Sequence, residues 1–186
     1  MNPIKNKKDL ETTIDELRKF AYAYIEKYSP SKQQLRIYLF KKFLNKNQKT
    51  SYKKELFNLI DVVISTLVEQ KFLSDKYYSD VKTKALLRRG YSLNKIRYNL
   101  IKKGIDEKYI KASISKIKEN ESDPDFFSAI KLCKRRRIGA CREESNRPLF
   151  YKKDISILAR SGFSYEISKK VLEIPKTDFK KFCKII

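Results

Sequence analysis

Lysine and arginine occur in short clusters along the chain, many of them at the ends of apolar segments, and such clusters are suited to contact phosphate groups. Guanidinium and ammonium groups hold phosphate oxygens by charge and hydrogen bonds without reading base sequence. The residues that we predict to form a binding surface are Arg36, Lys41, Lys42, Arg88, Arg89, Arg97, Lys102, Lys103, Arg135, Arg136 and Arg137. The alternative for any one of them is an exposed helix face whose cation interacts with the helix dipole.

The net charge of the chain points to the same class of partner. Among 186 residues, Lys and Arg number 44 and Asp and Glu number 22, which gives a net charge of +22. This excess is larger than solubility requires and indicates a polyanionic partner. A genome rich in lysine codons would explain the choice of lysine over arginine, but it would also enrich glutamate, aspartate and asparagine.

The motifs of common enzyme sites are absent from the sequence. There is no phosphate-binding GxxxxGK[ST], no dinucleotide fingerprint, no GxSxG, and no histidine to act as a general base. The acidic residues are scattered, and Asp75 (with Ser74 as the alternative), Asp106 and Asp123 are placed to cap helices. We therefore predict a binding protein that is not an enzyme and that uses no cofactor.

Three cysteines, Cys133, Cys141 and Cys183, lack the short spacing of metal ligands. We expect reduced thiols and no metal site. The segment 1–8 has no apolar region after its lysines, and no apolar run approaches the length of a membrane span. These features predict a soluble, cytoplasmic protein, which we expect to be a monomer.

One segment of the chain occurs twice. Ser31–Lys42 aligns with Ser92–Lys103, with a serine at the start, an arginine near the middle and a pair of lysines at the end. A shorter third echo, Leu158–Ser164, resembles Leu86–Ser92. Self-similarity of this kind is typical of tandem repeat architectures. Because the repeated segment is basic, we predict that the repeats supply both the fold and the binding surface.

Apolar residues recur with the period of a helix, and glycine (4) and proline (5) are scarce, which favours helices over a turn-rich β fold. Helices are expected at about 10–28, 31–44, 56–68, 75–90, 92–103, 106–117, 124–137, 152–161 and 164–172, with loops at 45–50 and 139–148. The predicted fold is all-α: a tandem array of three three-helix repeats, elongated and curved, with a short C-terminal tail helix. The expected boundaries are 1–9 for a basic N-terminal tail, 10–71, 72–120 and 121–174 for the repeats, and 175–186 for the tail helix.

Aromatic residues fall mostly on the predicted apolar stripes. Those expected in the core are Tyr22, Phe43, Phe72, Phe126 and Phe163. Tyr38 and Tyr98 differ, because they lie off the stripe beside basic residues, where a tyrosine ring could contact a ligand.

Three segments of the chain resemble motifs of the RecX family of RecA regulatory proteins. Phe72-Leu-Ser-Asp-Lys-Tyr-Tyr78 is similar to the family's GYLDDxxFA segment, and Ile96-Arg-Tyr-Asn-Leu-Ile-Lys-Lys-Gly-Ile105 looks like its IxxxLxxKGI. Ala159-Arg-Ser-Gly-Phe-Ser-Tyr-Glu-Ile167 looks like its closing xRRGFSxxxI. The motifs occur in the family's order, and the similarity covers about residues 15–172.

The resemblance implies a non-enzymatic protein of tandem three-helix repeats that acts in homologous recombination, DNA repair and the SOS response. Proteins of this family bind RecA filaments on single-stranded DNA, lie in the filament groove, and modulate, usually by inhibition, RecA's ATPase and strand exchange. For this chain it implies two partners: the RecA nucleoprotein filament and, weakly and with salt dependence, single-stranded DNA.

The chain departs from the family pattern at several positions. Phe43 and Lys71 stand where the family has glycine, Asp154 stands where it has an apolar residue, and Ser161 replaces an arginine. A second hypothesis is a DNA-binding protein of sequence-independent or helix-turn-helix type with no RecA partner. Against base readout, the repeated helices offer lysine far more than the arginine, asparagine and glutamine that read base edges. A third, a scaffold in an RNA complex, fits the charge but not the motifs.

Overall fold

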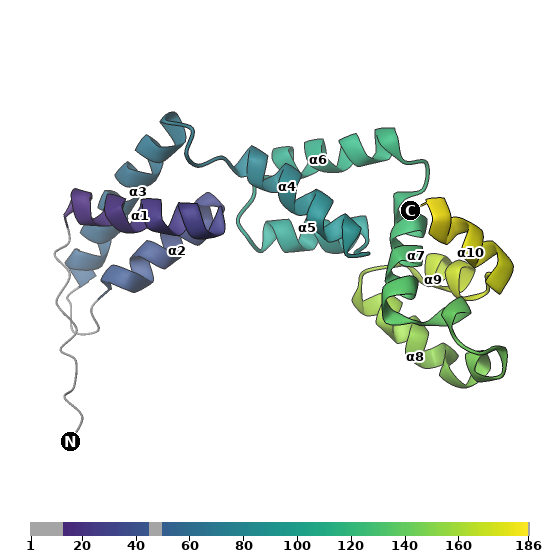
Figure 1. Ribbon diagram of the computed structural model, residues 1–186. Helices are drawn as coiled ribbons and strands as arrows, with labels where there is room; N and C mark the ends of the chain where they lie inside the picture. The colour runs from purple at the N-terminus through teal and green to yellow at the C-terminus, as the bar shows by residue number, and fades with distance from the viewer. Residues whose placement is uncertain (1–12, 45–49, 186) are drawn as a thin grey trace, which may run out of the picture. The chain divides into compact units, whose positions relative to one another are not determined.

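The computed structural model describes residues 13–44 and 50–185, and within them regular structure is helical throughout (Figure 1). The all-α prediction is confirmed for this part of the chain. The helices are α1 (Ile14–Tyr28), α2 (Lys32–Phe43), α3 (Thr50–Glu69), α4 (Asp75–Arg88), α5 (Leu93–Ile101), α6 (Glu107–Asn120), α7 (Pro124–Arg136), α8 (Arg147–Arg160), α9 (Tyr165–Leu172) and α10 (Lys176–Ile185), with 3-10 turns η1 (Gly139–Cys141) and η2 (Glu144–Asn146). The predicted basic tail, 1–9, lies outside the described residues.

The chain folds into two compact units, Met1–Tyr78 and Ser79–Ile186, which we call the first and second units. The division falls inside α4, so this helix contributes its first turn to the first unit and the rest to the second. The division into three repeats at 71/72 and 120/121 stays a prediction.

In the first unit, α1, α2 and α3 pack against one another in pairs (Figure 1). Apolar residues spaced about four apart lie on one face of each helix, which lets the three faces bury a common core. Its fully buried members are Leu17, Ala21, Leu35, Leu39, Leu56, Ile60 and Val63. Phe43 is buried as predicted, with its ring edge-on to Phe20.

Two aromatic residues that we expected in this core are exposed. Tyr22 is 39% exposed and Phe72 is 56% exposed, and their rings meet edge-to-face at 5.4 Å. The Tyr22 hydroxyl donates to the side-chain oxygen of Gln70 at 3.2 Å. The prediction was wrong because the two rings cover each other at the surface, next to the turn that ends α3.

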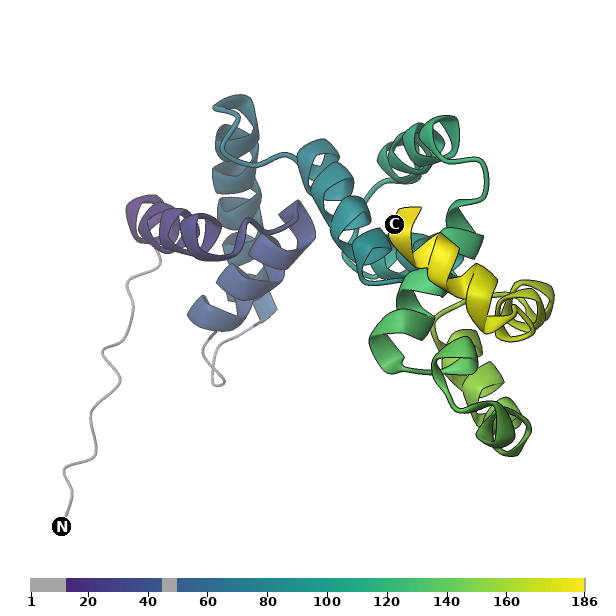
Figure 2. The same cartoon turned by 45° about the vertical axis from the view of Figure 1, so that its right-hand side comes forward.

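In the second unit, the largest apolar core lies among α7, α8, α9 and α10. Figure 2 shows α10 beside α7, and the two helices are in contact. The core contains Phe126, Ile130, Leu158, Phe163, Val171 and Phe179, so the predicted burial of Phe126 and Phe163 is confirmed. The helices α4, α5 and α6 of the same unit bury Leu86, Ile96, Leu100 and Ile110.

The region predicted as a loop at 139–148 is shorter and more ordered than expected. It contains η1 and η2, and α8 begins at Arg147 rather than at 152. Asp154 explains the order: it is only 2% exposed, and both of its oxygens accept hydrogen bonds from the Arg142 guanidinium, at 2.7 and 2.8 Å. The same carboxylate accepts the Gly139 N–H at 3.0 Å. A buried charge needs such partners, and they fix η1 against α8.

One turn geometry recurs at five helix ends. In each, a residue of positive φ ends the helix, and the apolar residue after it donates its N–H to the carbonyl five residues earlier, as in a Schellman motif. These bonds run from Phe72 to Leu67, Tyr91 to Leu86, Ile105 to Leu100, Ile138 to Cys133, and Phe163 to Leu158. The turn at Gly90 joins α4 to α5, and the turn at Gly162 joins α8 to α9. The similar segments Leu86–Ser92 and Leu158–Ser164 therefore form the same type of turn between different pairs of helices.

Gly90 and Gly162 are also points of close approach. A Cβ on Gly90 would lie 2.8 Å from the backbone of α7, and one on Gly162 would lie 2.4 Å from the Ser92 hydroxyl at the start of α5. These glycines therefore set the distance between helices as well as ending them.

Serine caps begin the repeated helices, as predicted. The hydroxyls of Ser31, Ser92 and Ser164 each accept the N–H three residues on, at 3.2, 3.1 and 3.2 Å. Ser31 also forms a capping box with Gln34.

Two aspartates close the amino ends of other helices. Of the two expected caps of α4, Ser74 accepts the Tyr77 N–H at 3.2 Å, and Asp75 instead accepts the Lys32 N–H of α2 at 2.9 Å. Asp125 accepts the Leu93 N–H of α5 at 2.7 Å. Burial raises the pKa of Asp125, although the Leu93 N–H acts in the opposite direction. In both places the first turn of a helix satisfies a free donor of an earlier helix.

Replacing Lys71 by glycine should stabilise the protein. Lys71 has φ of 62°, which is strained for a residue with a Cβ, and its side chain is exposed. We expect Lys71→Gly to raise the free energy of unfolding by about 1 kcal/mol, because the relief of strain exceeds the extra entropy of glycine. Urea titration followed by circular dichroism measures this change. Lys71→Ala removes the charge but keeps the Cβ, so a gain of equal size in that control would contradict the explanation.

Removing the Asp125 carboxylate should weaken the second unit. We expect Asp125→Ala to cost about 1 to 2 kcal/mol, because the Leu93 N–H loses its partly buried acceptor. Asp125→Asn keeps an acceptor oxygen and removes a desolvated charge, so its cost should be less than half as large. Equal losses in urea titrations of the two variants would show that the charge, and not the hydrogen bond, matters.

Candidate nucleic-acid interface

Arg36 and Arg97, which match in the repeated segment, form ion pairs inside the protein. The Arg36 Nη2 lies 2.6 Å from the Asp61 carboxylate on α3, and the Arg97 Nε lies 2.9 Å from Glu107 on α6. In each case an arginine from the helix that begins with the serine cap joins the helix that follows. The pairs are partly exposed, so each guanidinium can contact a phosphate only in competition with its carboxylate.

Lys102 lies at the end of α5 beside an exposed ring. Its Nζ is 4.6 Å from the centroid of Tyr98, and the Nζ of Lys95 is 5.6 Å from the same centroid. Tyr98 is 50% exposed, and the nearby Lys102 lowers the pKa of its hydroxyl through a hydrogen bond and through its charge. The three side chains combine an open ring with two cations, which suits a base and its flanking phosphates.

Lys95 is a member of this group that the sequence analysis missed. Its spacing from Tyr98, three residues, and from Lys102, seven residues, places all three on one side of α5 and could have revealed it. Lys103, which follows Lys102, is exposed on the turn after α5.

Lys41 and Lys42 of the first unit are exposed near the end of α2. The Nζ of Lys42 lies 4.8 Å from the centroid of the Phe20 ring, so its ammonium group forms a cation–π contact with that ring. The end of a helix favours cations, which accounts for two lysines here even without a ligand.

Arg88 ends α4 and Arg89 follows it, while Arg135 and Arg136 end α7; all four are exposed. Arg137 follows them as a left-handed cap with φ of 53°. In residues 13–44 and 50–185, no ion pair is found for any of these arginines. Their charges are therefore available to an anionic partner.

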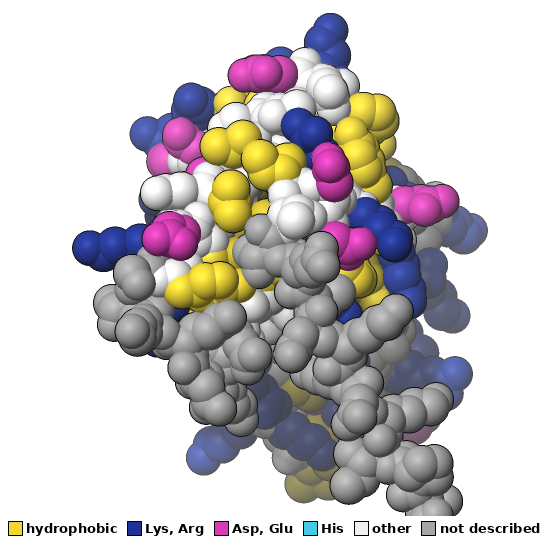
Figure 3. Space-filling model, turned by 90° about the vertical axis from the view of Figure 1, so that its left-hand side faces the viewer, with side chains coloured by type: hydrophobic (Ala, Val, Ile, Leu, Met, Phe, Trp, Pro, Cys, Tyr) yellow, Lys and Arg dark blue, Asp and Glu magenta, His cyan; other side chains and the backbone are white. Residues whose placement is uncertain are grey.

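The surface is not uniformly basic. On the face of the first unit turned to the viewer in Figure 3, Asp and Glu side chains lie among Lys and Arg side chains, with hydrophobic side chains between them. The predicted residues belong to both units, with Arg36, Lys41 and Lys42 in the first and the remainder in the second. Each unit thus presents its own basic groups.

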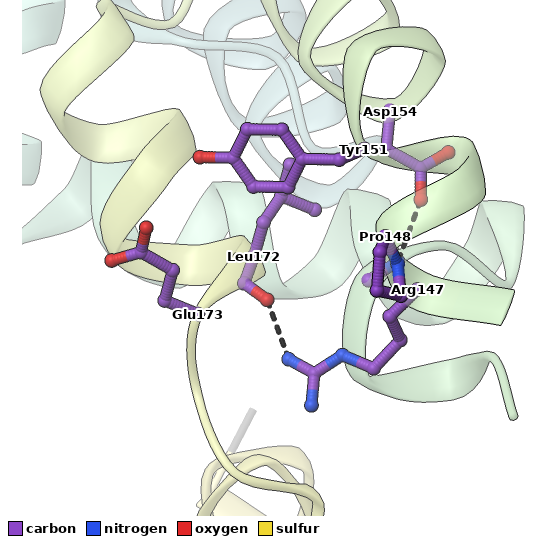
Figure 4. Close-up of a pocket in the computed structure, with 7 residues that line it drawn as sticks. Arg147, Pro148, Tyr151, Asp154, Leu172 and Glu173 are labelled. Carbon is purple, nitrogen blue, oxygen red and sulfur yellow. Dashed lines mark hydrogen bonds between the residues drawn. The ribbon is translucent and has the colours of Figure 1, made fainter. Parts of the chain in front are cut away.

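A pocket of about 460 Å³ lies in the second unit (Figure 4). Its lining consists of Gly139, Arg147, Pro148, Tyr151, Asp154, Leu172 and Glu173. Arg147 donates through Nη2 to the carbonyl oxygens of Leu172 and Ile174, at 2.6 and 3.0 Å, and Asp154 is engaged with η1. Arg147 thus joins the start of α8 to the end of α9, and Asp154 joins α8 to η1, so both side chains have a structural role.

The three cysteines are unpaired, and burial raises the pKa of the Cys133 thiol well above its usual range. Across the described residues, no group of three or more His, Cys, Asp or Glu side chains could hold a metal ion. The helices within those residues include none that is long and apolar enough to cross a membrane.

Curated relatives of the chain carry the name Regulatory protein RecX. The protein of Myxococcus xanthus is 27% identical over 164 residues, which cover 84% of each chain. The protein of Clostridium botulinum strain Eklund 17B is 33% identical over 115 residues, 61% of this chain and 52% of that one. The protein of Clostridium acetobutylicum is 28% identical over 156 residues, 83% of this chain and 66% of that one. The chain therefore spans about half the length of some relatives.

No protein-family model matches the chain, and no solved structure matches it significantly.

The ion pair of Arg97 and the open position of Lys102 predict different effects on DNA binding. We expect Lys102→Ala to reduce the slope of log affinity against log salt, on single-stranded DNA, by about 0.7, the value of one phosphate contact. Arg97→Ala should leave that slope unchanged and instead lower the free energy of unfolding by about 0.5 kcal/mol, as for an exposed ion pair. Fluorescence anisotropy across a salt series, beside urea titrations, measures both. If Arg97→Ala reduces the salt slope and Lys102→Ala lowers only the free energy of unfolding, Arg97 is the phosphate contact and Lys102 has the structural role.

Proposed function

We propose that the chain is a member of the RecX family, as its similarity to curated RecX proteins indicates, and that it regulates the RecA recombinase by binding RecA filaments on single-stranded DNA. The expected effect is modulation, in the direction of inhibition, of RecA's ATPase and strand exchange. The observation that carries the proposal is the match to a RecX protein over 84% of both chains.

The distribution of charge supports a filament as the partner. A filament on single-stranded DNA is a long polyanionic assembly, and both units of the chain present cations near helix ends. Contacts in two units connected in one chain add through effective concentration, so each can be weak while the whole binds firmly. The lysine-rich surface suits backbone contacts better than readout of base sequence.

Single-stranded DNA alone should be bound weakly and without sequence preference. Binding through phosphate contacts has dissociation constants of about 10⁻⁴ to 10⁻⁶ M at physiological salt. Strong preference for one duplex sequence would instead favour a helix-turn-helix protein without a RecA partner.

Reversing charge at Arg88 and Arg89 should impair regulation without unfolding the protein. Both side chains are exposed, with no ion pair found in the described residues, so R88E combined with R89E should change the melting temperature little. Each reversal replaces attraction to a polyanion by repulsion. The assay is RecA's ATPase on single-stranded DNA, titrated with the protein; we expect the double reversal to need at least tenfold more protein for the same effect, a change of about 1.4 kcal/mol.

A matched control separates a specific surface from net charge. K111E combined with K118E changes the net charge equally, at exposed positions of α6 outside the predicted surface. Regulation that falls equally in both double variants would show that only net charge matters. A wild-type protein without any effect on RecA's ATPase would refute the proposed function.

A further inference from the structure

Three tyrosines of the first unit form a ladder of rings, which we call the tyrosine ladder: Tyr28, Tyr24 and Tyr38. The rings of Tyr24 and Tyr38 are stacked, with centroids 4.0 Å apart and planes 10° from parallel. Tyr28 continues the series, with its centroid 4.8 Å from that of Tyr24 and its plane tilted by 47°. The ladder joins the end of α1 to α2.

The ladder is closed at one end and open at the other. Tyr24 and Tyr38 are half-buried, while Tyr28 is 57% exposed. Phenylalanines that serve the core, such as Phe43, Phe126 and Phe163, are almost fully buried. An exposed ring at the end of a stack does little for the core, because most of its surface stays in water. It offers a flat, rigid surface on which another ring can stack.

A cation accompanies the open end. The Nζ of Lys27 lies 5.3 Å from the centroid of the Tyr28 ring. Burial raises the pKa of Tyr24, and its tyrosine neighbours act in the same direction, so this hydroxyl stays neutral at physiological pH. Lys27 therefore meets no charge from the Tyr24 hydroxyl.

An aromatic stack with a lysine at its open end fits one class of ligand. A nucleobase in a single strand has a free face for stacking and a phosphate within reach of a cation, whereas the bases of a duplex are already stacked on one another. The net charge of +22 also favours a nucleic acid over an apolar protein surface.

We infer that the tyrosine ladder is a stacking platform for a base of single-stranded DNA, with Tyr28 in contact with the base and Lys27 with a neighbouring phosphate. This inference rests on the DNA-binding part of the proposed function and adds to it a contact outside the basic residues predicted from sequence. Regulation of RecA is not required for it to hold.

The test compares two strands that differ only in their bases. Affinities are measured by fluorescence anisotropy for an oligothymidylate and for an abasic strand of equal length, so phosphate contacts cancel in the ratio. The wild type is expected to prefer the strand with bases by about fivefold or more, the value of one stacked base. Y28A should lower this preference by about fivefold, the share of one stacked base, while a base stacked on Tyr98 is unaffected, and Y28F, which keeps the ring, should retain the wild-type ratio.

An equally exposed tyrosine outside the ladder supplies the control. Tyr165, at the start of α9, is 64% exposed, and Y165A should leave the ratio unchanged. As a measurement that needs no variant, photocrosslinking of the wild type to a strand containing 5-iododeoxyuridine should modify the peptide that contains Tyr28.

The inference is overturned if Y28A keeps the wild-type ratio, if the wild type has no preference for bases, or if the crosslink misses this peptide. If Y28A keeps the wild-type affinity ratio of the two strands but changes the protein's effect on RecA's ATPase, the ladder contacts a protein and not a base. This result also overturns the inference. If the wild type prefers the strand with bases as expected but has no effect on RecA's ATPase, the proposed function is refuted. The assignment of the ladder as a stacking platform then still holds.

Discussion

The helices of this protein depend on how their ends are closed. Short helices leave free N–H and C=O groups at every terminus, and a chain with this many termini must satisfy them all. Schellman turns at residues such as Gly90 and Gly162 satisfy the carbonyl ends and reverse the chain within a few residues. Serine hydroxyls and the carboxylates of Asp75 and Asp125 satisfy the amino ends. Because these two carboxylates come from other helices, closing an end also fixes a packing contact.

Charged side chains, like the helix ends, find partners on neighbouring elements of the fold. The matched arginines Arg36 and Arg97 bond to carboxylates on α3 and α6, and the buried Asp154 takes up Arg142. The cations left for a partner are chiefly those at helix ends, where the dipole already favours them. A surface built in this way costs the fold little, since it uses positions that packing leaves open. It also explains how a net charge of +22 coexists with compact units.

The similarity to RecX proteins and the two kinds of surface are consistent with one another. Cations near helix ends suit the phosphate backbone, and the tyrosine ladder suits a base whose face is free. Both kinds of contact are available on single-stranded DNA and on a filament that carries it. Neither kind of contact depends on base sequence, which agrees with the proposed action on filaments.

The sequence by itself determined the helices and most of their ends, because caps, left-handed turns and apolar spacing act between residues close along the chain. The serine caps and the all-α class were predicted in this way and are confirmed. Only the tertiary structure decided the partners of Arg36, Asp75 and Asp154, and the exposure of Tyr22 and Phe72. Each of these results depends on which helices meet in space. A carboxylate far away in the sequence can form an ion pair with an arginine, and one aromatic ring can cover another at the surface. The spacing of residues along the chain predicts neither contact.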